Sequence, residues 1–324
     1  IQRERERGKK RKNVKSIEKE MSIGCFVLAI TVSSVLSSPV VISSILRRDG
    51  VDVVLHPGTM RQHYDRMISD AVPFREFPQS YVQTAKNTPI DWREKGAVTP
   101  AKDQGPLGFC GTFGRTAAAE GQFAIHNHEL RNFSQEELID CIGWDQDQFS
   151  YFAEYGYMDM SAYPYIPNGT TTDEPPIPGK PCKYDAKQAI PGTLNGAFTN
   201  VTGKAPSEDQ LVAFLFHNGP VNTGINANVF GLREKNCEST KDCFITEEMC
   251  NDPTIKSQPI DHSITLVGYG TDDTKGDYWI VKNSWSEAFA NDGFIKVARG
   301  ISCAHIDCCG WVPTYGDVDS YYTT

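Results

Sequence analysis

A nearly continuous apolar stretch lies near the start of the chain, from Ile23 to Val41. It begins just after Met21, and serines gather near its end. A short apolar core that ends in small residues is typical of a secretory signal peptide, so we predict a signal at residues 21–38. A membrane anchor is the alternative, but the serines interrupt the run before it spans the roughly 30 Å of hydrocarbon. We therefore expect no stable membrane insertion.

Further along the chain, residue patterns predict helices and strands. Good helix formers fill residues 112–122, directly after a loop rich in Gly and Pro at 104–109, so we predict a helix there. Ser134 and Glu137 have the spacing of a capping box, which predicts that a second helix starts at Ser134. The apolar run at 264–267 is typical of a strand.

The composition is that of a globular protein. The 324 residues are 39% hydrophobic and 23% charged, enough for one large or two modest folded units. Residues 1–20 hold nine Lys and Arg against four Glu, a net charge of +5. Because the whole chain has a net charge of -9, the rest of the chain carries -14. An acidic body argues against nucleic-acid binding. Residues 1–20 precede the first methionine, and we expect them to be upstream or non-native sequence.

The ten cysteines predict one free thiol. A secretory signal implies an oxidising compartment, where cysteines pair as disulfides. Cys25 lies inside the predicted signal, and the remaining nine are an odd number. Cys110 stands between the Gly/Pro-rich loop and the predicted helix, where backbone N–H groups and the helix dipole favour a thiolate. Its local sequence fits a reactive thiol and a buried packing cysteine equally well.

Residues 88–105 (TPIDWREKGAVTPAKDQG) resemble the mature N-terminus of the papain-like cysteine proteases, the cathepsin L type especially. The resemblance extends over about residues 86–315. It implies an α+β papain-like fold of two lobes, a helical lobe at 88–195 and a β-rich, barrel-like lobe at 196–324, with the active-site cleft between them. It also implies a short pro-segment at 39–87. The other matching segments are Glu120-Gly121, Phe133 to Cys141, Ala162 to Tyr165, Gly219 to Val221, Asp261 to Ser263, Val267 to Gly270 and Lys282 to Trp285.

The resemblance implies a catalytic site of Cys110, His262 and Asn283. A thiol with a free pKa of about 8.5 is only a few per cent ionised at neutral pH, so attack on a peptide carbonyl needs a base. His262 would take the proton and deliver it to the leaving amine, while Asn283 orients the ring. Trp285 would shield that hydrogen bond, and the Gln104 amide with the Cys110 backbone N–H would hold the oxyanion. Taken singly, His262, Asn283 and Gln104 would be ordinary strand-end, turn and loop residues.

This chain departs from the family pattern near the nucleophile. The family has Cys-Gly-Ser-Cys-Trp, whereas residues 107–111 read Leu-Gly-Phe-Cys-Gly, and a downstream Cys-Asn-Gly-Gly segment is absent. The lost glycines predict a weaker or different grip on extended substrates. Gly111 removes a large packing side chain, and it and Gly114 weaken the helix by roughly 1 kcal/mol each relative to Ala. Ser286, Phe289 and Ala290 stand where the family usually has Gly, Trp and Gly.

Eight cysteines remain once Cys25 and Cys110 are set aside, enough for four bridges. The family pattern implies that Cys141 pairs with Cys182. It also implies a link from the loop before His262 to Cys308 or Cys309. His305 lies among cysteines and could indicate zinc, but an oxidising compartment favours disulfides, and the resemblance implies neither a metal nor a cofactor. The six cysteines whose 15 possible connectivities stay open are Cys237, Cys243, Cys250, Cys303, Cys308 and Cys309.

Three sequons, at Asn132, Asn168 and Asn200, are typical of glycosylated surface loops in a secreted protein. With the other features they predict a cysteine-type endopeptidase, secreted or lysosomal and made as a zymogen. We expect a monomer that acts on polypeptides, is inhibited by its own pro-segment and is open to cystatin-like inhibitors. The alternative is a catalytically impaired papain-fold protein that binds peptides. A disulfide-rich structural protein is disfavoured, because it gives no reason for Gln104 and His262 at family positions.

Overall fold

The computed structural model describes most of the chain from Glu76 to Tyr315 and one strand pair before it. The predicted signal, residues 1–20 and Asn168 lie outside the described residues, as does most of the predicted pro-segment. Strands β1 (Ser44–Arg48) and β2 (Val51–Leu55) form an antiparallel pair of their own. The described ranges are 44–48, 51–55, 76–143, 148–166, 182–191, 194–200, 207–233 and 237–315.

The helical part is organised around α3 (Cys110–Asn127), the helix predicted over 112–122. The helix ends where His128 takes a left-handed conformation with φ 56°. Helix α4 (Gln135–Cys141) begins as its capping box predicts, with the Ser134 hydroxyl accepting from the backbone N–H of Glu137 at 3.1 Å. Helix α5 (Gln148–Tyr155) and the short strands β4 (Tyr157–Met158) and β5 (Ala189–Ile190) complete this part. Its core holds Phe123, Phe133, Phe149, Phe152, Tyr157 and Trp311.

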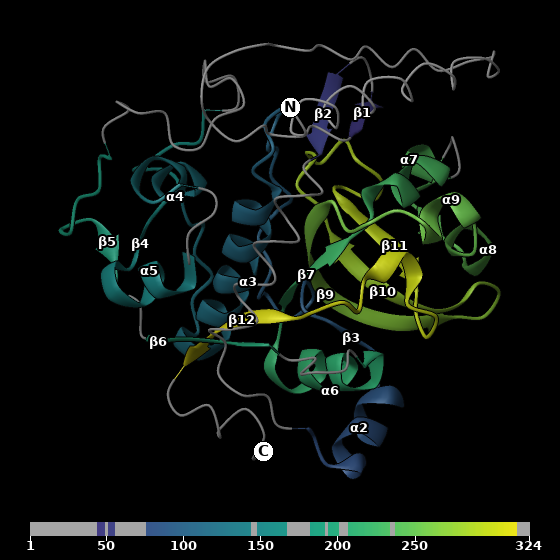
Figure 1. The fold of residues 1–324 in the computed structure, drawn as a ribbon. Coiled ribbons are helices and arrows are strands. Elements are labelled where there is room, and N and C mark those ends of the chain that lie inside the picture. Colours follow the sequence, from purple (N-terminus) through teal and green to yellow (C-terminus); the bar gives the residue numbers. More distant parts are fainter. Residues whose placement is uncertain are drawn as a thin grey trace, which may run out of the picture. The chain divides into compact units, whose positions relative to one another are not determined.

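The second part is built on a sheet of eight strands (Figure 1). Within the described residues the strand order is open, β6-β12-β7-β9-β10-β11-β8, with β3 pairing β9 at the side. The apolar run at 264–267 lies in β9, as predicted, and this strand is buried over most of its length. The strands are β3 (Ile90–Asp91), β6 (Leu194–Asn200), β7 (Val221–Ile225), β8 (Phe244–Ile245), β9 (His262–Asp272), β10 (Gly276–Lys282), β11 (Phe294–Ala298) and β12 (Trp311–Tyr315).

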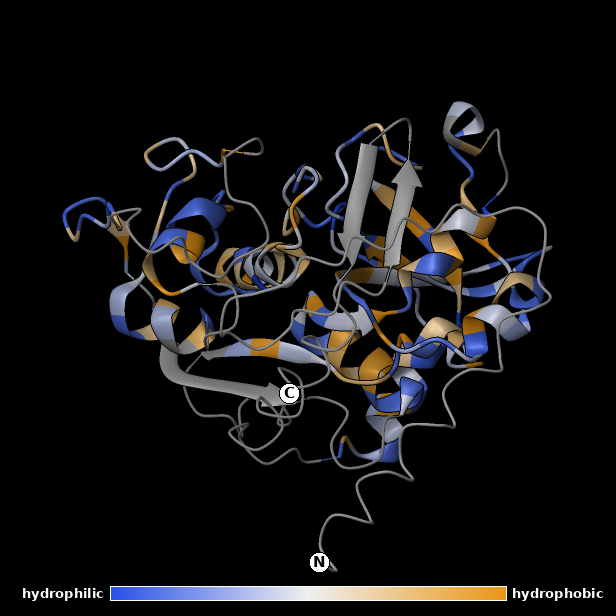
Figure 2. Cartoon of the chain, turned by 45° about the horizontal axis from the view of Figure 1, so that its top comes forward, coloured by the Kyte–Doolittle hydropathy of each residue, from blue (hydrophilic) through white to orange (hydrophobic). Residues whose placement is uncertain are grey.

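Short helices surround this sheet. Apolar residues lie on its strands and on the neighbouring helices (Figure 2), and together they form a large core. Helix α3 packs on β9, β12 and β7, so it joins the helical part to the sheet. The surrounding helices are α2 (Gln79–Lys86), α6 (Glu208–Asn218), η1 (Ala227–Leu232), α7 (Cys237–Thr240), α8 (Glu247–Cys250), α9 (Pro253–Lys256) and η2 (Cys303–His305).

Helix α2 is anchored in the core of the sheet part. Phe77, Val82 and Ala85 are 4%, 1% and 0% exposed. The Phe77 N–H donates to the Gln210 side-chain oxygen at 2.7 Å, and the Tyr269 hydroxyl donates to the Ala85 carbonyl at 2.7 Å. This segment is therefore an integral part of the packing around α6 and β9.

Candidate active site

Cys110 is the first residue of α3, and Phe109 before it is the N-cap with a non-helical backbone. The thiol thus stands at the N-terminus of an 18-residue helix. Its residue is 5% exposed, and burial raises the pKa of Cys110 to about 11. The backbone of Ser263, which follows His262, hydrogen-bonds to the thiol, and this bond and the charge of Arg115 act in the opposite direction on that pKa. The thiol therefore lies against the start of β9.

His262 opens β9 and is oriented by Asn283, which directly follows β10. These strands are antiparallel neighbours, so the start of one lies beside the end of the other. His262 Nε2 lies 2.8 Å from Asn283 Oδ1. An amide oxygen only accepts, so Nε2 carries the hydrogen and Nδ1 of the neutral ring is the nitrogen that can accept a proton. Burial lowers the pKa of His262 to about 4, and the hydrogen bond to Asn283 opposes this shift.

Trp285 covers the histidine. Its ring centroid lies 4.9 Å from that of His262, with the two planes tilted by 33°, and the residue is 5% exposed. An indole in this place excludes water from the imidazole and strengthens the hydrogen bond from His262 to Asn283. The structure thus brings together His262, Asn283 and Trp285 from β9 and the segment after β10.

Gly114 permits the close approach of α3 to the sheet. A β-carbon at this position would lie 2.5 Å from Asn222 Nδ2 and 2.6 Å from Ser263 Oγ. The Thr265 hydroxyl donates to the Gly114 carbonyl at 2.9 Å, which ties the helix to β9. The glycine that weakens the helix is therefore what allows Cys110 to sit beside the strand of His262.

Gln104 is fixed beside Asn283 through Ser284. It is 1% exposed, its side-chain oxygen accepts from the Ser284 hydroxyl at 2.6 Å, and its backbone N–H donates to the Ser284 carbonyl at 2.9 Å. The amide nitrogen donates to the Leu107 carbonyl at 2.7 Å. An amide nitrogen carries two hydrogens, so the bond to Leu107 uses one of the two.

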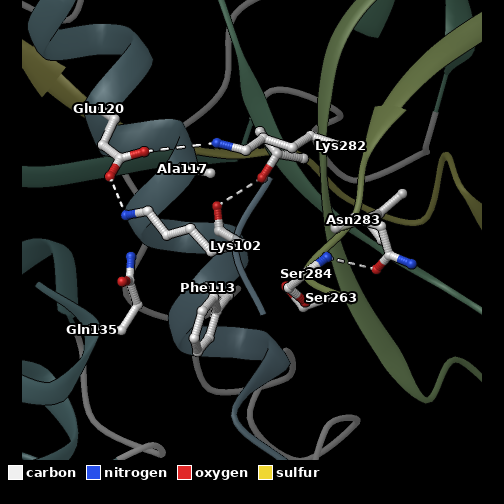
Figure 3. A pocket seen from close by; sticks show the side chains of 12 residues that line it. Lys102, Phe113, Ala117, Glu120, Gln135, Ser263, Lys282, Asn283 and Ser284 are labelled. Atoms are coloured by element: carbon white, nitrogen blue, oxygen red, sulfur yellow. Dashed lines mark hydrogen bonds and ion pairs between the residues drawn. The ribbon is translucent and has the colours of Figure 1, made fainter. Parts of the chain in front are cut away.

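A buried ion network lies behind these groups, and sequence reasoning did not find it (Figure 3). Glu120 on α3 pairs with Lys102 at 2.6 Å and with Lys282 at 3.8 Å. Thr99 completes the network, since its hydroxyl donates to Glu120 and accepts from Lys282. Burial lowers the pKa of Lys282 to about 8. A cavity of about 10 Å³ lies between this network and Asn283.

The network joins the three segments that hold the candidate site. Glu120 is on the helix of Cys110, Lys102 is two residues before Gln104, and Lys282 directly precedes Asn283. The sequence shows these three charged residues, but they lie 18 or more positions apart, and nothing in the sequence indicates that they contact one another. They become partners only when the chain folds.

Comparison with known proteins decides the family. The family model described as papain family cysteine protease matches residues 87–312. The chain belongs to the papain family of cysteine proteases. This confirms the resemblance noted in the sequence and the α+β papain-like fold of a helical lobe and a β-rich lobe.

Relatives in the papain family include procathepsin L of Felis catus, 32% identical over 224 residues, which cover 65% of this chain and 60% of that protein. A cathepsin L-like peptidase of Aedes aegypti is 33% identical over 238 residues, covering 69% and 63%. The chain thus spans less than two thirds of the length of these relatives. Among solved structures, the digestive procathepsin L2 proteinase from Tenebrio molitor larval midgut has a TM-score of 0.58 at 26% identity, covering 76% of this chain and 75% of that one.

Arg115 occupies the space beside Gly111, where the papain family pattern has a tryptophan. A β-carbon on Gly111 would lie 3.5 Å from the Arg115 guanidinium, and Arg115 is 2% exposed. The two later departures also have a structural consequence. Ser286 and Ala290 replace family glycines, and both have left-handed backbones with φ 64° and 49°. This conformation costs a residue with a side chain on the order of 1 kcal/mol.

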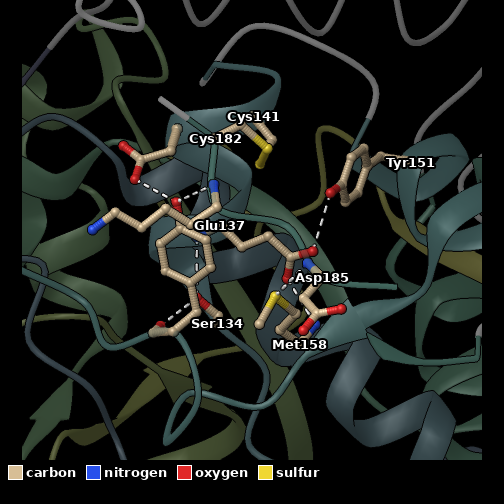
Figure 4. Close-up of a disulfide and its surroundings, with 10 residues drawn as sticks. Ser134, Glu137, Cys141, Tyr151, Met158, Cys182 and Asp185 are labelled. Carbon is tan, nitrogen blue, oxygen red and sulfur yellow. Dashed lines mark hydrogen bonds between the residues drawn. A yellow bond between two sulfur atoms is a disulfide. The ribbon is translucent and has the colours of Figure 1, made fainter. Parts of the chain in front are cut away.

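The disulfides confirm one expectation and correct another. Cys141 pairs with Cys182 as the papain family pattern implies (Figure 4). The expected link from the loop before His262 to Cys308 or Cys309 is wrong. The loop cysteine, Cys250, pairs instead with Cys303, because η2 brings that residue against α8. A third bridge joins Cys237 to Cys243. Cys308 and Cys309 are not bridged, so the predictions of four bridges and a single free thiol are wrong.

The thiols among the described residues are Cys110, Cys308 and Cys309. His305 does not join the nearby cysteines in a metal site: its Nε2 lies 3.1 Å from the Gln258 carbonyl. Across the described part of the chain, no group of three or more His, Cys, Asp and Glu side chains is arranged to hold a metal ion.

Two of the sequons fall on described residues. Asn132 is exposed, and its amide nitrogen lies 3.5 Å from the sulfur of Met160. Asn200 is the last residue of β6 and so ends a strand rather than lying in a loop. In the ranges that the structure describes, no helix is both long and apolar enough to cross a membrane.

Proposed function

We propose that this protein is a cysteine-type endopeptidase that hydrolyses peptide bonds with Cys110, His262 and Asn283. The observation that carries the proposal is the 2.8 Å contact of His262 Nε2 with Asn283 Oδ1. That contact leaves His262 Nδ1 as the proton acceptor. Ser263, the next residue, contacts the Cys110 thiol through its backbone. Geometry and residue types together support a thiol nucleophile with an oriented base.

Catalysis begins with proton transfer from the Cys110 thiol to His262 Nδ1. Burial favours the neutral form of each group, with pKa values of about 11 and about 4, so the two charges are favourable only when they form together and face each other. The thiolate attacks the substrate carbonyl. The Cys110 backbone N–H and the remaining N–H of the Gln104 amide hold the oxyanion. His262 then protonates the leaving amine, and water attacks the thioester.

We further propose that the protein is made as a secreted or lysosomal zymogen, a monomer whose N-terminal segment blocks the cleft. Relatives from Felis catus, Rattus norvegicus and Mus musculus carry the name procathepsin L, which supports a pro-segment. The burial of Phe77, Val82 and Ala85 in the core supports a mature chain that keeps α2. Cleavage is therefore proposed upstream of Glu76, before this helix, instead of at residue 87. Polypeptides are the proposed substrates, and cystatin-like proteins the proposed inhibitors.

Turnover of a small fluorogenic peptide between pH 4 and 7 by the acid-processed chain tests the proposal. Wild type should cleave it, Cys110→Ala should not, and His262→Ala should lose at least about a thousandfold in kcat. The exposed Ser257→Ala is the matched control and should keep full activity. The intact mass of the processed chain should place its first residue upstream of Glu76.

The second candidate is a papain-fold protein that binds peptides without cleaving them. Its support is the hydrogen bond of the Gln104 amide nitrogen to the Leu107 carbonyl, which takes up half of the oxyanion donor in this conformation. Tight peptide binding without turnover in wild type would favour this candidate and reject the endopeptidase.

A further inference from the structure

Cys308 and Cys309 form a pair of adjacent thiols outside the three disulfides. Their sulfur atoms lie 2.7 Å apart. Cys308 is partly exposed, whereas Cys309 is 2% exposed. Cys308 is therefore the member of the pair nearer to solvent, and the Cys309 sulfur lies within reach of the Cys308 sulfur.

The main chain around the pair is held by Thr223 on β7. Its buried hydroxyl lies 2.8 Å from the carbonyl oxygens of both Ile306 and Cys309. The same oxygen lies 3.8 Å from the Cys308 sulfur and 3.7 Å from the Cys309 sulfur. The hydroxyl has one hydrogen and donates to one of these carbonyls at a time, but its position keeps both Ile306 and Cys309 close to β7.

The two thiols share their protons. Burial and the neighbouring sulfur raise the pKa of Cys308. Burial also opposes ionisation of Cys309, but hydrogen bonds from Cys308 and Thr223 outweigh it and lower the pKa of Cys309. The pair therefore loses a first proton more readily than an isolated buried thiol, and the remaining proton can pass between the two sulfurs.

We propose that Cys308 and Cys309 are a reversible covalent modification site, which a small-molecule disulfide of the glutathione class oxidises to a vicinal disulfide. The Cys308 thiol passes its proton to the Cys309 thiolate, and the resulting Cys308 thiolate attacks the reagent, whose S–S bond breaks and releases one small thiol. The Cys309 sulfur then attacks the Cys308 sulfur and releases the second small thiol. The two cysteines lose two electrons and two protons, and the reagent gains them as two thiols.

Sequence adjacency makes this bond different from the three others. Neighbouring Cα atoms are about 3.8 Å apart across a trans peptide, below the usual range of about 4.4 to 6.8 Å for disulfides. The three bridges of the protein have Cα separations of 4.6, 4.6 and 5.0 Å. The vicinal bond should therefore be the strained, easily reduced member of the set, which suits a labile modification and not a structural bridge.

The pair also lies one strand away from the candidate active site. The Cys308 thiol approaches the Gly224 carbonyl at 3.8 Å, and on β7 Gly224 and Ile225 are the pairing partners of Ser263 and His262. Cys309 belongs to the same buried apolar cluster as Cys110. The proposal does not depend on peptidase activity, because its readout is the mass of the cysteines.

The test equilibrates the full chain at pH 7 in glutathione buffers of increasing oxidised share, followed by acid quench, blocking of thiols with N-ethylmaleimide and fragmentation mass spectrometry. In wild type, Cys308 and Cys309 should lose their two maleimide groups together, and the peptide should be lighter by two hydrogens. The midpoint should lie at a more oxidising potential than that of Cys250–Cys303.

Two single variants separate this route from others. In Cys309→Ser, glutathione should stay attached to Cys308, because no neighbouring thiol can displace it. In Cys308→Ser, the buried Cys309 should remain a free thiol. The proposal is overturned if wild type accumulates the glutathione adduct as Cys309→Ser does, if the two thiols react independently at every ratio, or if either pairs with Cys110.

Discussion

At the residue scale, Cys110 lies in a place where burial disfavours a thiolate. The groups that act in the other direction are the Ser263 backbone, Arg115 and the Gly111 backbone. Arg115 is the one among them that carries a charge, and it lies where the family pattern has a tryptophan beside the nucleophile. Its guanidinium therefore both fills space and supports the anion.

Arg115→Met tests this role. Methionine keeps much of the packing but removes the charge, so the thiolate of Cys110 should become less stable. The pH midpoint for alkylation of Cys110 by iodoacetamide should rise by about one unit. Arg115→Lys keeps a cation and should stay close to wild type. An unchanged midpoint in Arg115→Met would mean that the residue only fills space.

The residue types of the site could be predicted from the sequence, but their surroundings could not. His262 and Asn283 were predicted from the family pattern. They lie in hydrogen-bonding contact because they stand at the neighbouring ends of two paired strands. The role of Arg115 was missed. The sequence shows that Gly111 lacks a side chain, but it does not show that Arg115 fills the space beside it. Gly114 was interpreted as a weakness of the helix, since its contacts with Asn222 and Ser263 join residues more than 100 positions apart.

At the element scale, the Glu120 carboxylate on α3 pairs with a lysine in the segment of Gln104 and with another directly before Asn283. Glu120 is 0% exposed and faces the buried Lys282 and the partly buried Lys102, so it is the counterion of two cations. Removing one partner of a buried ion network leaves an uncompensated charge in a place that water does not reach.

Glu120→Gln should therefore lower the free energy of unfolding by about 3 to 5 kcal/mol, measured by denaturant titration. Asp209→Asn is the matched control. It breaks the Lys86–Asp209 pair, which is also short at 2.9 Å but has side chains 39% and 48% exposed, and should change stability little. Equal losses in the two variants would contradict a special role for the buried network.

Helix boundaries that depend on neighbouring residues could be predicted from the sequence. A disulfide between distant residues could not. The capping box at Ser134 and the helix after the Gly/Pro-rich loop follow from residues a few positions apart. The Cys250–Cys303 bridge depends on how η2 packs against α8, over a separation of 53 residues. Spacing alone could not choose it among the 15 connectivities.

At the scale of the whole molecule, buried acids link folding to pH. Burial raises the pKa of Glu137 to about 7 and that of Asp261 to about 6. The folded state therefore holds these protons when the unfolded state has released them, so their contribution to stability grows as pH falls through those values. His262 acts in the opposite sense, because its lowered pKa makes the unfolded state take up a proton first, between about pH 6.5 and 4.

Glu137→Gln isolates one of these contributions, since it removes the titration and keeps the shape. Relative to this variant, wild type should gain about 2 kcal/mol of stability between pH 7.5 and 5, seen as a rising difference in Tm. A difference that stays constant over this range would contradict a raised pKa for Glu137. A protein stabilised in this way would suit an acidic lysosome, one of the two locations that we propose.

The central claim is that Cys110 is a nucleophile activated by His262, and labelling with an irreversible thiol-directed epoxide tests it most directly. Mass spectrometry of the processed protein should find one adduct, on Cys110. It should be absent in Cys110→Ala and much slower to form in His262→Ala. An unreactive or already oxidised Cys110, or labelling that does not depend on His262, would contradict the account.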